Sequence, residues 1–436
     1  MSGTATLVLT GDSMITRGIA MNENDDARAL AAHIGNGDAA LTNLEVLPND
    51  FKGYPAQECG GTHMAASSSV VDTLTGLGFN LFPAATNHAL DYSIEGLLAT
   101  IDVLNEKGVV WAGLGRNMAE ARMPAYLDTD RASFGLISVC SSFAKGQQAS
   151  EQRPDMPGRP GLNPLRVATT YDISAEHLEA LREIAEAIGI EQRRRERIAL
   201  GFGHPPADES IFPFFDLSFR AAETAGVQVT PNAGDMDAIA QWVREARGRA
   251  DIVVVSLHAH EQGETKEDPA DFIPVFARRM IDEGADVIVG HGPHLLRGIE
   301  VYNGKPIFYS LGNFIAQNDL VHKFPSDAYE RFRVDPTMTP GEIARTRSDD
   351  GKRGFPSDVR YWETVSPRLT WQDGTLTSIE LAPVTLRQTD AVYRRGRPRL
   401  ARHDEARSIL TRLGELSAPF GTTIEIDGEM GRVKLG

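Results

Sequence analysis

The chain has 436 residues, 41% of them hydrophobic, which is enough for one large domain with insertions or for two domains. Its formal charge of −16 argues against nucleic acid and anionic membrane surfaces as partners, because both require a basic protein surface. Cys59 and Cys140 are the only cysteines, and no signal peptide or membrane-spanning run is recognisable. We therefore expect a cytoplasmic protein without a disulfide framework.

The first third of the chain predicts strands that end on polar side chains. An apolar run over residues 4–10 stops just before Asp12, and a second over 38–45 finishes on Glu45. A third, over 79–85, leads into Asn87 and His88. Helices are predicted over 70–77 and 94–107, each followed by a glycine, and residues 49–69 are predicted to form a long loop that contains His63. This alternation of strands and helices indicates an α/β fold.

The regular pattern stops between residues 141 and 232. A stretch rich in proline and glycine precedes a charged segment, residues 175–197, which predicts one helix. We interpret residues 141–232 as a helical insertion between two parts of a catalytic core, residues 1–140 and 233–318. The run Arg193-Arg194-Arg195 lies on the charged helix and is interpreted as a solvated face, because the whole chain is acidic.

Two further predicted strands are each followed by a pair of histidines. The run over residues 251–257 ends at His258 and His260, and the run over 286–289 ends in a turn rich in glycine and proline that carries His291 and His294. Asn303-Gly304 predicts a hairpin turn. Residues 319–436 are expected to form an extension that packs on the core, with a late hairpin around residues 373–374; residues 334–358 are polar and show no clear pattern.

The polar groups at the strand ends are suited to form one site for cation binding or acid/base catalysis. Ligands of open α/β sheets bind outside the carboxyl ends of the strands, so these side chains are expected to face one crevice. Carboxylate, amide and imidazole donors suit a divalent cation, and the lack of a cysteine cluster disfavours a structural zinc site. The same groups are also suited to general acid and base catalysis. Any one of them alone would be an ordinary capping or surface residue.

Six motifs, in order, resemble the CapA or poly-γ-glutamate capsule synthesis family, which belongs to the calcineurin-like metallophosphoesterase superfamily. They are Gly11-Asp12-x-Met14-x-x-Arg17, Asn43-Leu44-Glu45, Asn87-His88-x-x-Asp91-Tyr92, His258, Gly290-His291-Gly292-Pro293-His294 and Tyr309-Ser310-Leu311-Gly312-Asn313. The resemblance covers about residues 4–318 and implies a calcineurin-like two-sheet sandwich flanked by helices. It also implies that His88 is an acid/base histidine. The residues that match the metal-binding positions (the metal shell) of the family are Asp12, Glu45, Asn87, His258, His291 and His294.

The chain departs from the superfamily pattern in its first motif. The usual Asp-x-His is Asp12-Ser13-Met14 here, so one ligand of a two-metal centre is missing. One hard cation, Ca²⁺ or Mg²⁺, is therefore as reasonable as a binuclear Mn, Fe or Zn centre. Many relatives of this type are exported or membrane-anchored, whereas this sequence shows no such segment, which disfavours an extracellular capsule polymer as substrate.

One functional hypothesis is a peptide epimerase similar to the lasso-peptide epimerases, which share this fold and invert a Cα centre near the carboxyl end of a precursor peptide. Such a reaction needs an acid/base group on each face of the Cα and a cation that stabilises the developing negative charge. We predict Asp12 with His294 on one face and His88, oriented by Asp91, on the other. The predicted substrate-binding residues are Arg17, His63, His260 and Arg297.

The alternative is a metal-dependent hydrolase of phosphoester or amide (glutamyl) bonds, in which His88 would protonate the leaving group. A third interpretation is a capsule-assembly protein without activity, which the number of potential ligands disfavours. Turnover of a generic phosphoester that is lost with chelator and in His258→Ala would support the hydrolase, whereas the epimerase requires Cα hydrogen–deuterium exchange on a precursor peptide.

Overall fold

The computed structural model describes residues 3–20 and 24–435. Its main sheet is organised around β1 (Thr4–Met14), which pairs in parallel with β2 (Ala39–Leu44) and β17 (Asn313–Ala316) and antiparallel with β18 (Glu363–Gln372). The strand order is β21-β22-β19-β18-β1-β2-β3-β4. The other strands of this sheet are β3 (Leu81–Pro83), β4 (Val110–Ala112), β19 (Thr375–Thr385), β20 (Arg399–Leu400), β21 (Ile424–Asp427) and β22 (Met430–Val433).

The second sheet has the order β15-β16-β14-β13-β7-β6. Its central strands, β7 (Ser133–Cys140), β13 (Ile252–His258), β14 (Val287–His291) and β16 (Lys305–Phe308), are parallel. The edge strands β6 (Ala125–Asp128) and β15 (Ile299–Tyr302) are antiparallel to their neighbours. β15 and β16 are joined by the predicted Asn303-Gly304 turn, where both residues have positive φ.

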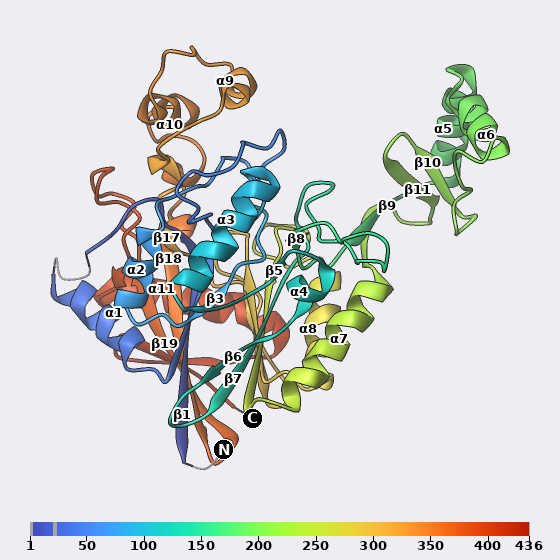
Figure 1. The fold of residues 1–436 in the computed structure, drawn as a ribbon. Coiled ribbons are helices and arrows are strands. Elements are labelled where there is room, and N and C mark those ends of the chain that lie inside the picture. The colour runs from blue at the N-terminus through green and yellow to red at the C-terminus, as the bar shows by residue number, and fades with distance from the viewer. Residues whose placement is uncertain (1–2, 21–23, 436) are drawn as a thin grey trace.

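The two sheets enclose one hydrophobic core. Leu7 and Leu9 of β1 share it with Val254 of β13 and Val289 of β14, and all four are fully buried. Helices cover the outer faces: α1 (Asp25–Gly35) and α2 (Ser69–Gly76) lie over the main sheet, and α7 (Ala233–Arg247) and α8 (Phe272–Asp282) lie over the second (Figure 1). The helices α3 (Ser93–Glu106), α4 (Met118–Arg122) and α11 (His403–Ser417) pack around this body. The predicted α/β fold class is confirmed.

The segment predicted as a helical insertion contains a sheet as well as helices. Its four strands have the order β10-β11-β9-β12, and the segment projects away from the two large sheets (Figure 1). Residues 141–166 instead lie on the main body, where β5 (Leu114–Gly115) pairs with β8 (Gly161–Leu162). The elements are β9 (Val167–Ile173), α5 (Ala175–Ala187), α6 (Ile190–Ala199), β10 (Ile211–Phe214), β11 (Leu217–Ala221) and β12 (Gly226–Pro231).

The single charged helix predicted over residues 175–197 is wrong. Gly189, at φ +75°, separates α5 from α6, because a left-handed residue ends one helix before the next begins. The helices pack on the small sheet through Leu178, Ala185 and Phe212.

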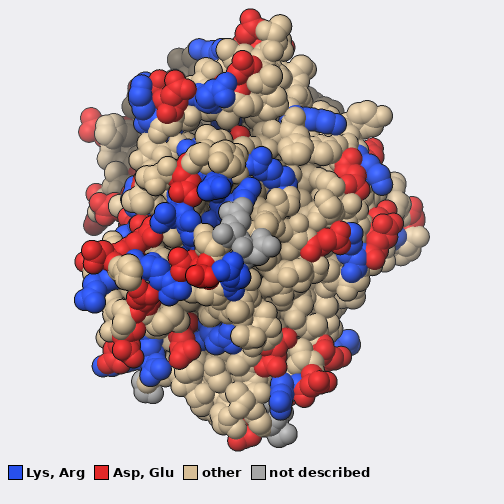
Figure 2. Space-filling view, turned by 90° about the vertical axis from the view of Figure 1, so that its left-hand side faces the viewer, with Lys and Arg blue, Asp and Glu red and all other residues tan. Residues whose placement is uncertain are grey.

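The C-terminal residues continue the main sheet. The predicted late hairpin is present as β18 and β19, with Asp373 and Gly374 in its turn, and β18 pairs directly with β1. Residues 334–358 contain α10 (Pro340–Ser348), which follows α9 (Ser326–Phe332), and a short 3-10 turn at Phe355–Ser357; a second 3-10 turn, Val359–Trp362, comes directly after them. Within the described ranges, no helix is both long and apolar enough to cross a membrane. On the face drawn in Figure 2, basic and acidic side chains are interspersed.

Candidate metal and acid/base site

The polar residues at the strand ends converge because both sheets direct strand ends to the same edge of the sandwich. In the main sheet, Asp12 of β1 is in register with Asn43 of β2 and Asn313 of β17. In the second sheet, His258 at the end of β13 is in register with His291 at the end of β14. The crevice predicted from the sequence is therefore formed by the two sheets together.

Glu45 lies at the centre of this cluster. Its side chain is fully buried, and neither carboxyl oxygen has a hydrogen-bond partner among the described residues. Its Oε1 lies 3.8 Å from Nε2 of His88, 3.7 Å from Nε2 of His258 and 3.6 Å from Nε2 of His294. Burial raises the pKa of Glu45 well above its usual range, and the negative charges of Asp12 and Asp91 raise it further. A buried carboxyl group without partners is costly unless a cation accompanies it.

Asp12 is the negatively charged group of the cluster. Its Oδ1 accepts a hydrogen bond from Asn43 Nδ2 at 2.9 Å, and its Oδ2 accepts one from the Gly292 amide at 3.1 Å. The Nδ1 atoms of His291 and His294 lie 3.5 and 3.4 Å from the carboxylate. Burial alone would raise the pKa of Asp12, but the neighbouring His291 and His294 rings outweigh burial and hold the pKa well below its usual range.

His258 and His260 point their ring nitrogens at each other. The two Nε2 atoms are 3.1 Å apart, and His258 Nε2 is also 3.0 Å from Asn87 Oδ1. Burial lowers the pKa of His258 and, with help from His294, lowers that of His260 to about 3. Both rings are thus neutral at physiological pH and have lone pairs available. His260, predicted to contact substrate, groups with Glu45 and His258 as a candidate ligand.

The residues present fit a divalent cation. Two groups, Glu45 with His258 and His260, and Asp12 with Glu45 and His294, each have ligand atoms within 4.8 Å of one another. Glu45 belongs to both, and the two ring nitrogens of the fully buried His291 have no hydrogen-bond partner among the described residues. A mixed oxygen and nitrogen set with unused donor capacity is typical of a cation site.

His88 is held beside this cluster by Asp91. Its Nδ1 lies 2.6 Å from Asp91 Oδ2, which leaves Nε2 directed toward Glu45. The Asp91 carboxylate also accepts hydrogen bonds from the amides of Gly60 and Met64, at 3.3 and 2.8 Å. A Cβ on Gly60 would lie 2.8 Å from Cε1 of His88, so only glycine allows the loop to pack this closely. These contacts fix the Asp91 carboxylate against His88, and its orienting role in catalysis stays a prediction.

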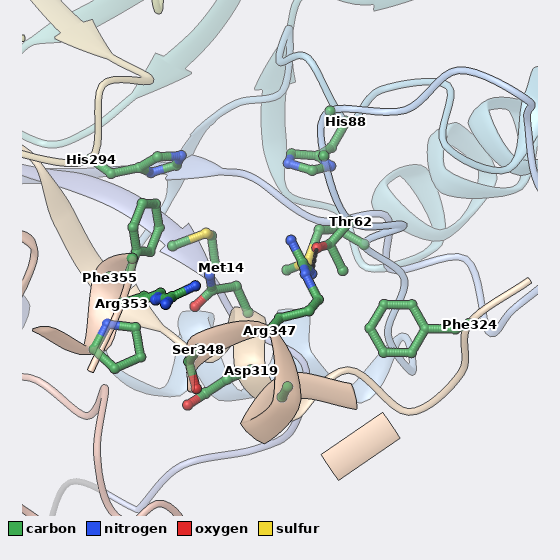
Figure 3. A pocket seen from close by; sticks show the side chains of 17 residues that line it. Met14, Thr62, His88, His294, Asp319, Phe324, Arg347, Ser348, Arg353 and Phe355 are labelled. Carbon is green, nitrogen blue, oxygen red and sulfur yellow. Dashed lines mark hydrogen bonds between the residues drawn. The ribbon is translucent and has the colours of Figure 1, made fainter. Parts of the chain in front are cut away.

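A cavity of about 350 Å³, here called the main cavity, opens beside His88 and His294. Figure 3 shows the two rings on opposite sides of it, with Met14 between and below them and Arg347 and Phe355 contributed by the segment after α9. His294 has φ +64°, an uncommon conformation for a residue other than glycine. Such local strain is often found at functional sites, where the surrounding structure imposes it.

The predicted substrate-binding residues divide into two groups. Arg17 donates from Nη2 to the Tyr393 carbonyl at 2.8 Å. It lines neither the main cavity nor a second, adjacent cavity that includes Lys266 and Tyr361. His63 is buried, with Nε2 2.8 Å from the Ala56 carbonyl oxygen, and it also lines neither cavity. Arg297 and His260 do lie beside the cluster, in the second cavity.

Other residues of the site were not predicted. Asn43 bridges Asp12 and His258, and Asn313 lies 2.9 Å from His294 Nδ1, so both position ligands. Both stand in the motifs that carried the family resemblance, which was a usable signal. No local pattern indicated that Arg347, far along the chain, would line the main cavity.

Comparison with known proteins identifies the family of the chain. Residues 6–318 match the family described as bacterial capsule synthesis protein PGA_cap. The uncharacterized protein y4uA of Sinorhizobium fredii is 33% identical over 99% of this chain and 93% of its own length. The capsule biosynthesis protein CapA of Bacillus anthracis is 25% identical over 71% of this chain and 59% of its own, and the PGA biosynthesis protein CapA of Bacillus subtilis is 26% identical over 58% and 47%. The chain therefore belongs to the bacterial capsule synthesis protein PGA_cap family.

Proposed function

We propose that this protein is a cation-dependent peptide epimerase of calcineurin-like fold that inverts a Cα centre near the carboxyl end of a ribosomal, lasso-type precursor peptide. The observation that carries the proposal is the pair of imidazoles, His88 and His294, on two sides of one cavity (Figure 3). Their Nε2 atoms lie 3.8 and 3.6 Å from the same oxygen of Glu45, so a Cα held beside Glu45 can be reached from two directions.

Each imidazole has an acidic partner that supports proton transfer. Asp91 accepts from His88 Nδ1, so Nε2 of His88 is free to give or take a proton at the substrate. His294 lies 3.4 Å from the ionised Asp12, which stabilises the imidazolium that forms when His294 accepts a proton. One group removes the Cα proton and the other returns a proton to the opposite face.

The residues that would hold the cation during epimerisation are Asp12, Glu45, His258, His260 and His291, with Asn87 beside them. His294, also predicted as a metal-shell residue, borders this set and would keep its Nε2 for proton transfer. A divalent cation there would stabilise the negative charge that develops next to the Cα. Ca²⁺ or Mg²⁺ is proposed for a single ion, and Mn, Fe or Zn for a pair. We further propose that the protein acts in the cytoplasm without a nucleic-acid or membrane partner.

Deuterium incorporation tests the epimerase proposal. Synthetic precursor-type peptides with different C-terminal residues are incubated with the protein and Ca²⁺ or Mg²⁺ in D₂O. Digestion, mass spectrometry and chiral amino-acid analysis then locate any deuterium and any D-residue. We expect one non-exchanging deuteron at a single Cα near the carboxyl end, lost in His88→Gln. His403→Gln, at an exposed surface histidine, serves as the matched control. Absence of Cα exchange across the peptide set would overturn the proposal.

A metal-dependent hydrolase is the second candidate. It is favoured by the two ligand groups that share Glu45, because such an arrangement can hold two cations side by side, as many phosphoester hydrolases require. In that reaction His88 would protonate the leaving group. Turnover of p-nitrophenyl phosphate that disappears with chelator and in His258→Ala, together with no Cα exchange, would support the hydrolase instead.

A further inference from the structure

A second cavity of about 260 Å³ lies next to the main cavity and has three residues in common with it: Gly60, His294 and Phe355. The residues that distinguish it are His260, Gln262, Lys266, Pro293, Arg297 and Tyr361. It therefore touches the ligand cluster through two histidines and carries two basic side chains. No residue of this cavity is needed by the acid/base scheme above except His294.

Arg297 is an incompletely satisfied cation. Its side chain is only 1% exposed, Nε donates to the Lys266 carbonyl at 3.0 Å, and Nη2 donates to the Glu261 carbonyl at 2.9 Å. These two bonds fix the plane of the guanidinium group, while Nη1 has no partner among the described residues. Burial lowers the pKa of Arg297 to about 10, so it remains charged at neutral pH. A buried charge of this kind requires an anion close by.

Lys266 is the second cation. Its Nζ donates to the Tyr361 hydroxyl at 2.9 Å and lies 5.6 Å from the centre of the same ring. Within the described part of the chain, no carboxylate lies within 4.0 Å of this ammonium group. The tyrosine thus positions the charge in the cavity wall without neutralising it.

Among the described residues, the carboxylates of the same loop form no ion pair with Lys266 or Arg297; Glu261 and Asp268 act on Arg297 only at longer range, where their charges partly offset the effect of burial on its pKa. Glu261 accepts from Ser141 and Ser142, Asp268 accepts from Thr265, and Glu267 pairs with Arg360 and Arg412. The second cavity thus carries two cationic side chains without a direct carboxylate partner among the described residues.

We propose that Lys266 and Arg297 form a subsite that binds the substrate's carboxylate and so presents the neighbouring Cα to His294. This inference rests on the proposed function. Arg297 supplies a fixed N–H donor and Lys266 supplies a mobile charge, which together suit a carboxylate at the end of a peptide. The main cavity, lined by Met14, Met64, Phe324 and Phe355, then takes the side chain of that residue.

A binding measurement tests the subsite without depending on catalysis. N-acetyl-L-phenylalanine and its carboxamide differ only at the carboxylate, and their dissociation constants are compared by titration calorimetry. We expect the acid to bind about 10- to 100-fold more tightly, the factor that charge-assisted hydrogen bonds provide. Lys266→Met should reduce this preference to about threefold or less. Lys323→Met is the matched control, because Lys323 also lies over an aromatic ring, that of Phe51, and lines neither cavity.

The outcomes separate this inference from the proposed function. Equal binding of acid and amide, or an unchanged preference in Lys266→Met, overturns the subsite even if Cα exchange is observed. Tighter binding of the acid without exchange of any peptide keeps the subsite and rejects the epimerase. Inorganic phosphate that displaces the acid and binds at least tenfold more tightly would overturn the carboxylate assignment and identify a phosphate site.

Discussion

Replacement of Glu45 by methionine is expected to stabilise the cation-free protein and to abolish its response to cations. Glu45 is fully buried and neither carboxyl oxygen has a partner among the described residues. A buried polar group without a hydrogen bond costs about 1–3 kcal/mol, and methionine fills a similar volume with apolar atoms. The free energy of unfolding of Glu45→Met in chelator should therefore exceed that of the wild type by about 1–3 kcal/mol.

Glu300 provides the matched control, because it is a second buried glutamate, 7% exposed, but one with partners. It accepts from Arg278 Nε at 3.0 Å and from the Tyr309 hydroxyl. Glu300→Met leaves the Tyr309 hydroxyl without its acceptor and should destabilise the protein by about 2–4 kcal/mol. The two substitutions have the same chemistry and opposite expected signs, because the Glu300 carboxylate has hydrogen-bond partners, whereas the Glu45 carboxyl oxygens have none among the described residues.

The assay is urea denaturation followed by tryptophan fluorescence, with chelator and with Ca²⁺, Mg²⁺ or Mn²⁺. At a free cation concentration 100 times the dissociation constant, the wild type should gain about 2.7 kcal/mol and Glu45→Met should gain nothing measurable. If Glu45→Met destabilises the cation-free protein as much as Glu300→Met does, or remains stabilised by cation, Glu45 is not the central ligand.

Three further predictions follow from single contacts. Asp91→Asn removes the carboxylate whose Oδ2 lies 2.6 Å from His88 Nδ1, and should lower the Cα exchange rate about 100-fold or more. Cation binding, measured by calorimetry, should stay unchanged. An exchange rate equal to that of the wild type would contradict the orienting role. Burial, and then the charge of Arg368, lower the pKa of His33 to about 4, so the unfolded chain binds more protons than the folded one between about pH 6.5 and 4. Stability should therefore decrease as the pH is lowered through that window, by about 2 kcal/mol after allowance for partial exposure. His33→Gln should flatten this part of the plot of urea midpoint against pH, and an unchanged plot would exclude His33 as its source. Thr339→Ala removes the N-terminal cap of α10 and should cost about 1 kcal/mol of local stability, measured as faster amide hydrogen exchange in α10 only. Exchange that is unchanged in α10, or faster throughout the protein, would contradict this capping role.

Local signals explain what was predictable from the sequence. Buried strands such as β13 are short apolar runs, and the two hairpin turns carry Asn303-Gly304 and Asp373-Gly374, whose positive φ values suit these residues. The polar residue after each strand indicated the candidate cluster, because parallel strands bring their carboxyl ends to one edge and both sheets direct that edge to the same side.

The missed features have different physical causes. The helix α10 was predictable, since Thr339, Pro340 at the first turn and Glu342 form a capping box that begins it. Gly189 was an equally local signal for the break between α5 and α6. In contrast, the pairing of β18 with β1 joins residues more than 350 positions apart, and such pairings are set by the packing of the whole sheet.

Side-chain direction was the least predictable property of the site. Arg17 stands in the first motif, yet its guanidinium group binds the Tyr393 carbonyl instead of entering the main cavity. Arg347 enters that cavity from a segment whose sequence carries no functional signature. Such directions depend on tertiary partners far along the chain, which periodicity and motif spacing do not report.

The most direct test of the central claim, that the strand-end cluster binds a divalent cation, is the cation content of the purified protein. Elemental mass spectrometry is applied to the wild type and to Asp12→Ala, each purified without added metal and again after exposure to Ca²⁺, Mg²⁺ and Mn²⁺ followed by desalting. We predict at least one divalent cation per chain in the wild type and a clear loss in Asp12→Ala. A wild type that retains no cation under any of these conditions, or an Asp12→Ala variant with undiminished content, would contradict the account.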